Sequence, residues 1–126
     1  MAKKVLVVDD DPRQVSDIRF LLESEGYSIL TANDGSAGYD MALSEKPDLV
    51  ILDLIMPITD GFETVKKFGE NSMTAHIPII AITAIRSKKN VSFKLEPDVD
   101  WFPVEAVLDK PFKDDVFLDV VKKYMG

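Results

Sequence analysis

The sequence of 126 residues contains no cysteine, and its single histidine is His76. The lack of thiols excludes disulfide bonds, thiol chemistry and cysteine-ligated zinc, and it fits a reducing compartment. His76 lies in the loop before a predicted strand, away from the other candidate functional residues, so we expect it at the surface. Metal ligands in this chain therefore have to be oxygen atoms.

The chain also lacks a long apolar run. The first residues are basic and then apolar, as in a signal peptide, but acids interrupt the apolar run after Val8. No stretch approaches the length needed to span a bilayer. We therefore expect a soluble, cytoplasmic protein without membrane insertion.

Positive charge is in short supply. The chain has 15 Lys and Arg against 22 Asp and Glu, which gives a formal net charge of −7. This charge repels phosphate backbones, so direct binding of nucleic acid is not expected.

Strand and helix signals alternate along the chain without repeats or linkers, a pattern that predicts one α/β domain over residues 1–126. Helices on both faces would cover a parallel sheet. The predicted strands are Lys4–Val8, Ser28–Ala32, Leu49–Asp53, Pro78–Ile82 and Ala106–Leu108. The predicted helices begin at Pro12 behind an Asp11 cap, cover Ala37–Leu43, follow Asp60-Gly61, and close the chain with Phe117, Val120, Val121 and Tyr124 facing inward. A poor helix is expected over Arg86–Leu95, and a loop over Glu96–Pro103.

The strand Leu49–Asp53 reads as buried on both faces and ends in an acid. Desolvating a carboxylate costs several kcal/mol unless a partner compensates it. Other polar residues follow the remaining strands, and the carboxyl ends of parallel strands meet at one edge of a sheet. These residues are Asp9, Asp10, Thr83 and Lys110.

Three carboxylates at one edge repel one another by roughly a few kcal/mol per pair, which a hard, oxygen-ligated ion such as Mg²⁺ would relieve. Asp53 could then attack phosphorus to form an acyl phosphate. Lys110 and the Thr83 hydroxyl would stabilise the phosphoryl oxygens.

At these residues the sequence resembles the receiver domains of two-component response regulators, the family of the bacterial chemotaxis regulator. The resemblance covers essentially the whole chain and implies a flavodoxin-like, doubly wound sheet of five parallel strands in the order 2-1-3-4-5. The matching motifs, in order, are Val7–Asp10, Leu52–Pro57, Asp60-Gly61, Thr83-Ala84 and Lys110–Phe112.

The resemblance also implies partners and roles. The phosphoryl donor would be a sensor histidine kinase, a histidine phosphotransfer protein or a small donor such as acetyl phosphate. The output would be a downstream protein target, with dimerisation on phosphorylation as a further option. The implied roles are phosphoacceptor for Asp53, direct Mg²⁺ ligand for Asp10, water-mediated Mg²⁺ ligand for Asp9, third protein ligand for the Ile55 backbone carbonyl, switch hydroxyl for Thr83 and phosphoryl partner for Lys110.

Two features depart from the family pattern. Val107 stands where the family often has a tyrosine or phenylalanine that takes part in the switch. The stretch between Thr83 and Lys110 is longer than usual and carries Trp101 and Phe102, so the usual output face would be reshaped around an irregular fourth helix.

Three alternatives remain open from the sequence. A Mg²⁺-dependent aspartyl phosphotransferase or phosphatase usually has a second acid where this chain has Ile55. A flavin-binding protein of the same fold would meet three aspartates where it needs a phosphate loop. A docking module of the same fold could work without phosphorylation. The favoured interpretation is a signalling receiver rather than an enzyme, and a chain complete at 126 residues would act by docking or by passing the phosphoryl group on.

Overall fold

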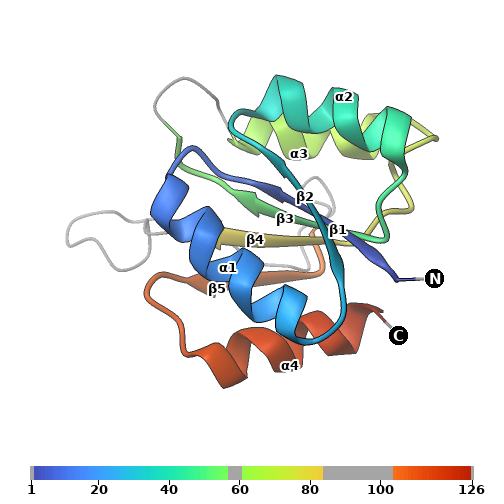
Figure 1. The fold of residues 1–126 in the computed structure, drawn as a ribbon. Coiled ribbons are helices and arrows are strands. Elements are labelled where there is room, and N and C mark those ends of the chain that lie inside the picture. The colour runs from blue at the N-terminus through green and yellow to red at the C-terminus, as the bar shows by residue number, and fades with distance from the viewer. Residues whose placement is uncertain (1, 57–60, 84–103, 126) are drawn as a thin grey trace.

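The computed structural model describes residues 2–56, 61–83 and 104–125. Its strands alternate with helices along the chain (Figure 1). The strands are β1 (Lys4–Val8), β2 (Ser28–Ala32), β3 (Leu49–Asp53), β4 (Ile79–Thr83) and β5 (Ala106–Asp109). The helices of the described residues are α1 (Pro12–Ser24), α2 (Gly35–Glu45), α3 (Gly61–Glu70) and α4 (Asp114–Met125).

The five strands form one parallel sheet in the order β2-β1-β3-β4-β5. The predicted fold class and strand order are therefore confirmed. The order reverses between β1 and β3, which places these strands at the centre and their carboxyl ends side by side. In sheets of this type, functional groups collect beyond that point.

Alternation along the strands sends side chains to two separate cores. Leu6 and Val8 of β1 join the core under α2 and α3, whereas Val5 and Val7 join the core under α1 and α4. Figure 1 shows these helix pairs on opposite sides of the sheet. Every residue of β3 and β4 is buried, as expected for central strands covered on both faces.

The ends of α1 follow the sequence signals. Asp11 caps the helix, since its carboxylate accepts a hydrogen bond from the Arg13 backbone at 3.0 Å, and Pro12 opens the first turn. Glu25 ends the helix, and Gly26 then takes a positive φ of 90° that a glycine adopts without strain.

The predicted bounds of α2 were too short. Asp34 lies outside the predicted helix Ala37–Leu43, but its carboxylate accepts a hydrogen bond from the Ala37 backbone at 2.7 Å and caps a helix that begins at Gly35. At the other end the helix continues to Glu45, and Lys46 closes it in a left-handed conformation with φ 50°.

Two glycines allow helices to approach the central strands closely. A Cβ atom on Gly38 of α2 would lie 2.7 Å from a methyl group of Val8. A Cβ atom on Gly61, the first residue of α3, would lie 2.4 Å from Cα and 2.5 Å from the carbonyl oxygen of Leu54. Both contacts are at the carboxyl end of the sheet, next to Asp9 and Asp53.

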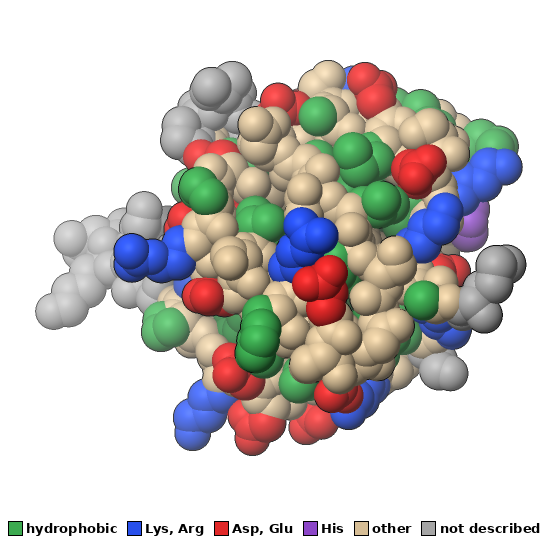
Figure 2. Space-filling model, viewed as in Figure 1, with side chains coloured by type: hydrophobic (Ala, Val, Ile, Leu, Met, Phe, Trp, Pro, Cys, Tyr) green, Lys and Arg blue, Asp and Glu red, His purple; other side chains and the backbone are tan. Residues whose placement is uncertain are grey.

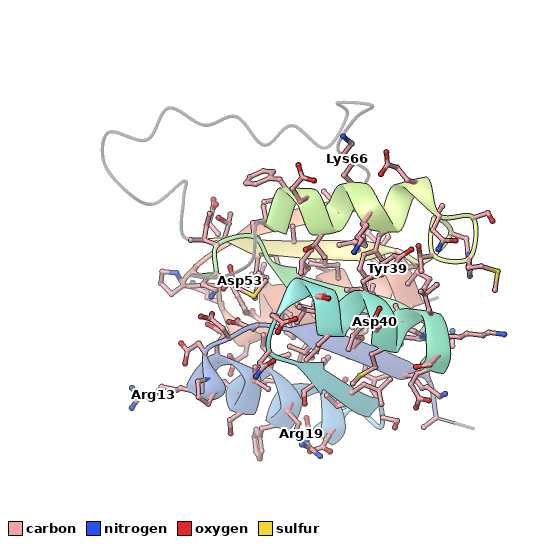
Figure 3. The ribbon with its side chains drawn as sticks, turned by 90° about the horizontal axis from the view of Figure 1, so that it is seen from above. Arg13, Arg19, Tyr39, Asp40, Asp53 and Lys66 are labelled. Atoms are coloured by element: carbon pink, nitrogen blue, oxygen red, sulfur yellow. The ribbon has the colours of Figure 1, made fainter. Side chains whose placement is uncertain are left out.

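On the same face, α2 and α3 are joined to each other through Tyr39 (Figure 3). The Tyr39 ring meets Phe68 edge to face at 5.6 Å, and the Lys67 ammonium lies 4.9 Å from the ring centre. The Asn71 side chain donates a hydrogen bond to the Tyr39 hydroxyl at 2.6 Å. On the opposite face, the ion pair between Lys122 of α4 and Glu25, the C-cap of α1, is 2.7 Å long and solvent-exposed.

Other expectations are partly answered. His76 is exposed, as predicted, and Phe117 and Val121 face the core from α4, with Val120 and Tyr124 half-buried.

Within the described ranges, no helix has the length and apolar character of a membrane span. On the face in Figure 2, basic side chains are scattered among acidic ones. The expected poor helix over 86–95, the loop over 96–103, and Trp101 and Phe102 lie outside the described residues.

Candidate functional site

Asp53 is the last residue of β3, and its side chain is 5% exposed. Both carboxylate oxygens have partners. Oδ1 accepts a hydrogen bond from the Ile55 backbone at 2.9 Å, and Oδ2 accepts one from the Lys110 ammonium at 3.0 Å. The buried acid that the sequence left without a partner is thus held on one side by a backbone N–H and on the other by a cation.

Strand pairing brings Thr83 and Lys110 to the same edge. Asp53 pairs with Ile82 of β4, so Thr83 lies one residue beyond, and Thr83 pairs in turn with Asp109, which precedes Lys110. The Lys110 backbone N–H donates a hydrogen bond to the Thr83 carbonyl at 2.8 Å. Thr83 is completely buried, whereas the Lys110 side chain keeps 20% of its surface exposed.

Asp9 follows β1 and is 2% exposed. Its Oδ1 accepts a hydrogen bond from the Asp11 backbone at 3.0 Å, and its own backbone N–H donates to the Ala32 carbonyl of β2 at 3.1 Å. Its Oδ2 lies 3.5 Å from the Lys110 ammonium, an ion-pair distance without hydrogen-bond geometry. Among the described residues, this oxygen is the one buried side-chain polar atom that has no hydrogen-bond partner.

Burial and neighbouring charges at this edge shift the pKa values of Asp9 and Lys110. Burial raises the pKa of Asp9 from 3.8 to about 6, and the neighbouring charge of Asp53 adds to that rise, against the hydrogen bond from Asp11 and the charge of Lys110. For Lys110, burial lowers the pKa, but the hydrogen bond and charge of Asp53 and the charge of Asp9 outweigh it, so that the pKa lies above its ordinary value. The Lys110 ammonium therefore stays charged, and its charge does not offset the effect of burial on Asp9.

The acidic cluster fits a hard divalent cation. One carboxylate oxygen each from Asp9, Asp10 and Asp53 lie within 4.8 Å of one another. Asp10 is exposed and the other two are buried, so the cluster opens to solvent on one side. Oxygen ligands with room for water suit Mg²⁺, and a water molecule on the cation would also give the unpartnered Asp9 Oδ2 a hydrogen-bond donor.

The two remaining sequence expectations concern Ile55 and Val107. Ile55 as a whole residue is 41% exposed, and its backbone is next to the cluster because its N–H donates a hydrogen bond to Asp53. Val107 of β5 is half-buried and packs against the core under α2 and α3. An aliphatic residue thus occupies the position where the resemblance implies a mobile aromatic ring.

Comparison with known proteins agrees with this geometry. The sequence model of the response regulator receiver domain matches residues 5–122, and the chain belongs to this family. Receiver domains carry phosphorylation-dependent signals in two-component systems.

Individual relatives cover the chain from end to end. The polar-differentiation response regulator DivK of Brucella anthropi is 30% identical over 126 residues, which are 100% of this chain and 98% of DivK. Chemotaxis response regulator CheY4 of Vibrio cholerae superposes with a TM-score of 0.81 at 26% identity, over 98% of this chain and 99% of CheY4. The receiver domain of sensor histidine kinase PA1611 of Pseudomonas aeruginosa has a TM-score of 0.86 at 24% identity, over 100% of this chain and 99% of that domain.

The structure also adds residues that sequence reasoning missed. Gly61 packs closely against Leu54, the residue between Asp53 and Ile55. Gly38 packs closely against Val8, the residue before Asp9. The sequence predicts Asp60-Gly61 as a helix start and as one of the motifs of the resemblance, but it gives Gly61 no positioning role. The sign of a positioning role is a backbone approach too close for a Cβ atom. Such an approach is visible in the structure but not in the sequence.

Proposed function

We propose that this chain is a phosphoryl-accepting receiver domain over residues 1–126 and that Asp53 is its phosphoacceptor. The supporting observation is the Asp53 carboxylate, which is buried at the end of the central strand and yet oriented from two sides by Ile55 and Lys110. A carboxylate that serves only stability would not stand beside Asp9 and Asp10 in a cluster with one unpartnered oxygen.

The phosphoryl donor is the phosphohistidine of a sensor histidine kinase or of a histidine phosphotransfer protein. A carboxylate oxygen of Asp53 attacks phosphorus and forms the P–O bond of an acyl phosphate. The P–N bond of the donor breaks, its electron pair returns to the imidazole nitrogen, and that nitrogen takes up a proton. The role of the chain is to place the nucleophile and to neutralise the arriving charge, which are the main contributions of a protein to phosphoryl transfer.

Lys110 and Thr83 are the groups that receive the transferred oxygens. The Lys110 ammonium, which pairs with Asp53 at 3.0 Å, would exchange this partner for a phosphoryl oxygen. Thr83 offers a hydroxyl one position beyond the residue that pairs with Asp53, and its movement toward the phosphoryl group would alter the surface that a downstream protein recognises.

Mg²⁺ is the proposed cofactor. Asp9, Asp10 and Asp53, with the backbone carbonyl of Ile55, would hold it, with Asp10 as a direct ligand and Asp9 acting through water. When bound, Mg²⁺ neutralises negative charge on the phosphoryl oxygens. The PA1611 receiver domain was crystallised with a magnesium ion coordinated in its active-site cleft, which supports the same arrangement at this acidic cluster.

Intact-mass spectrometry after incubation with acetyl phosphate and Mg²⁺ tests the proposal. We expect a labile gain of one phosphoryl group in the wild-type protein, and no gain with a chelator or in Asp53→Asn. Asp48→Asn is the matched control, because Asp48 lies at the opposite end of the same strand and binds the Lys4 backbone at 2.9 Å.

The control should gain the phosphoryl group as the wild type does. Uptake by Asp53→Asn would move the acceptor to another residue. If neither acetyl phosphate nor a phosphorylated histidine phosphotransfer protein labels a wild-type protein that binds Mg²⁺, the chain is a docking module that does not use phosphorylation. Sustained turnover of phosphate esters would instead favour a phosphatase.

A further inference from the structure

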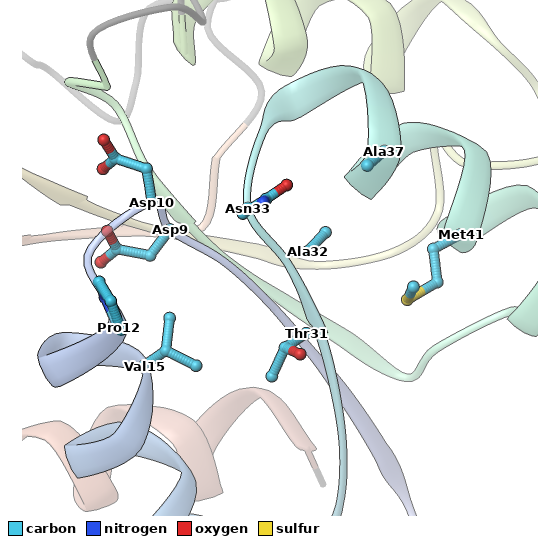
Figure 4. A pocket seen from close by; sticks show the side chains of 9 residues that line it. All are labelled: Asp9, Asp10, Pro12, Val15, Thr31, Ala32, Asn33, Ala37 and Met41. Carbon is cyan, nitrogen blue, oxygen red and sulfur yellow. The ribbon is translucent and has the colours of Figure 1, made fainter.

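Lys110 supplies a cation to the carboxyl edge of the sheet, at the point where the buried acids meet. Its ammonium lies 3.0 Å from Oδ2 of Asp53 and 3.5 Å from Oδ2 of Asp9. Figure 4 shows the carboxylates of Asp9 and Asp10 projecting from adjacent positions after β1, on the side away from Met41 of α2. A metal ion held by this acidic cluster would therefore share two of its carboxylates with the ammonium.

The backbone keeps this ammonium at the site. The Lys110 backbone N–H donates a hydrogen bond to the Thr83 carbonyl at 2.8 Å, and Thr83 pairs with Asp109 in the sheet. The Lys110 side chain is 20% exposed, so solvent screens its charge less than that of a surface lysine. The positive charge beside Asp53 is therefore built into the fold.

Two cations that share carboxylates oppose each other in two ways. Like charges a few ångströms apart repel strongly where the effective dielectric is low. In addition, the hydrogen bond from Lys110 to Asp53 Oδ2 would have to weaken before the Asp53 carboxylate could give its full charge to a metal ion. Both effects reduce the affinity of the cluster for a divalent cation.

We propose that Lys110 is an internal counter-ion that competes with Mg²⁺ for the acidic cluster and keeps the metal affinity low before phosphorylation. This inference rests on the proposed function, because it concerns the regulation of the same site. When a phosphoryl oxygen takes over the Lys110 ammonium, the competition ends and the carboxylates are left to the metal. Metal binding is then weak in the resting protein and tighter once the phosphoryl group has arrived.

The opposite effect would arise if Lys110 were needed to orient the metal ligands. The structure gives these carboxylates other anchors. Asp53 Oδ1 accepts a hydrogen bond from the Ile55 backbone at 2.9 Å, and Asp9 Oδ1 accepts one from the Asp11 backbone at 3.0 Å. Both acids therefore stay oriented when the ammonium is removed, so the charge of Lys110 rather than its hydrogen bond decides the metal affinity.

Calorimetric titration with magnesium chloride, without any phosphoryl donor, tests the inference. Lys110→Met should bind Mg²⁺ at least about tenfold more tightly than the wild type, which corresponds to about 1.4 kcal/mol. Lys110→Gln is equally neutral, should show the same gain, and replaces Lys110→Met if that variant does not fold. Lys110→Arg retains the charge and should bind Mg²⁺ within about threefold of the wild type.

Lys113→Met is the matched control. Lys113 is exposed and lies shortly after Lys110 in the chain, and its replacement removes the same positive charge. Within the part of the chain that the structure describes, the ion pairs of Asp9 and Asp53 are made by Lys110 and not by Lys113. The Mg²⁺ affinity of this variant should stay within about twofold of the wild type, because solvent screens an exposed charge.

Three results would overturn the inference. Weaker, unchanged or undetectable Mg²⁺ binding in both neutral variants would show that Lys110 does not compete with the metal. An equal gain in Lys113→Met would assign the effect to net charge, and an equal gain in Lys110→Arg would assign it to the shape of the side chain. Phosphoryl uptake is measured separately by intact mass, so the inference can fail while uptake at Asp53 holds. Tighter Mg²⁺ binding without uptake would instead overturn the proposed function alone.

Discussion

The two ends of the sheet treat charge in opposite ways. At the amino end, Asp48 accepts a hydrogen bond from the Lys4 backbone at 2.9 Å, and Glu105 accepts one from the Ile79 backbone at 2.6 Å. Both acids are exposed and both tie neighbouring strands together. At the carboxyl end, Asp9 and Asp53 are buried and share one ammonium group.

This difference indicates that the acids at the amino end of the sheet contribute to stability, whereas those at the carboxyl end do not. Exposed acids that bind backbone N–H groups stabilise strand ends at little desolvation cost. Buried carboxylates close to one another destabilise the folded state unless a ligand arrives. Each prediction below therefore compares the effect of a substitution at the carboxyl end of the sheet with that of a matched substitution elsewhere in the chain.

Removal of Lys110 should give the largest loss of stability. In Lys110→Met, the buried carboxylates of Asp53 and Asp9 lose their shared cation, and the free energy of unfolding without Mg²⁺ should fall by about 3 kcal/mol. Lys122→Met removes the exposed ion pair to Glu25 and should cost far less, because solvent screens that pair. Urea unfolding with a chelator measures both, and equal losses would contradict the contrast between buried and exposed pairs.

A methyl group on Gly61 should have the next largest effect. In Gly61→Ala, the new Cβ atom would collide with the backbone of Leu54 and displace the segment that holds Asp53 and Ile55. We expect a loss of about 2 kcal/mol in stability, typical of overpacking, and weaker Mg²⁺ binding by calorimetry.

The control is Gly69→Ala, at an exposed position of the same helix. This substitution should be neutral, or stabilising by up to about 1 kcal/mol, and should leave Mg²⁺ affinity unchanged. Unchanged affinity in Gly61→Ala would exclude its positioning role.

Neutralising Asp9 should have a smaller effect of the opposite sign. Because the folded pKa of about 6 lies above the ordinary 3.8, the Asp9 contribution to stability is present below pH 3.8 and is lost as the pH rises through 6. At neutral pH without Mg²⁺, Asp9→Asn should therefore be more stable than the wild type, by about 1 to 2 kcal/mol. The upper limit is about 3 kcal/mol, which is what a pKa rise from 3.8 to about 6 gives at about 1.4 kcal/mol per pKa unit.

Unfolding curves across that pH range measure this effect. The difference between Asp9→Asn and wild type should vanish at low pH and shrink again when Mg²⁺ stabilises the wild-type protein. Asp48→Asn, at the amino end, should show no gain. A variant that is less stable than wild type at neutral pH without Mg²⁺ would show that the Asp9 carboxylate is well compensated.

Much of this contrast was accessible from the sequence. Strong β-branched runs and punctuating prolines predicted all five strands, and parallel topology then brought Asp9, Asp53 and Lys110 to one edge. The start of α2 was missed because Asp34 before Gly35 signals a turn as readily as a helix cap, and only the hydrogen bond to Ala37 decides between them.

Side-chain geometry was not accessible. No sequence pattern states that one oxygen of Asp9 lacks a hydrogen-bond partner while the other is satisfied, because this depends on rotamers and on the approach of Lys110. Sequence reasoning identified the residues of the candidate site but not the free space around them.

The link between α2 and α3 through Tyr39 has a consequence for motion. An aromatic contact, a cation over the ring and a hydrogen bond all join the two helices, so they are expected to open together as one cooperative unit. The exposed pair between Lys122 and Glu25 is a weaker tie between α1 and α4. Amide hydrogen exchange should therefore be similar in α2 and α3, which would make these two helices one cooperative unit. On the opposite face, α1 and α4 share buried core residues, but the charged pair between them is exposed and adds little to their coupling.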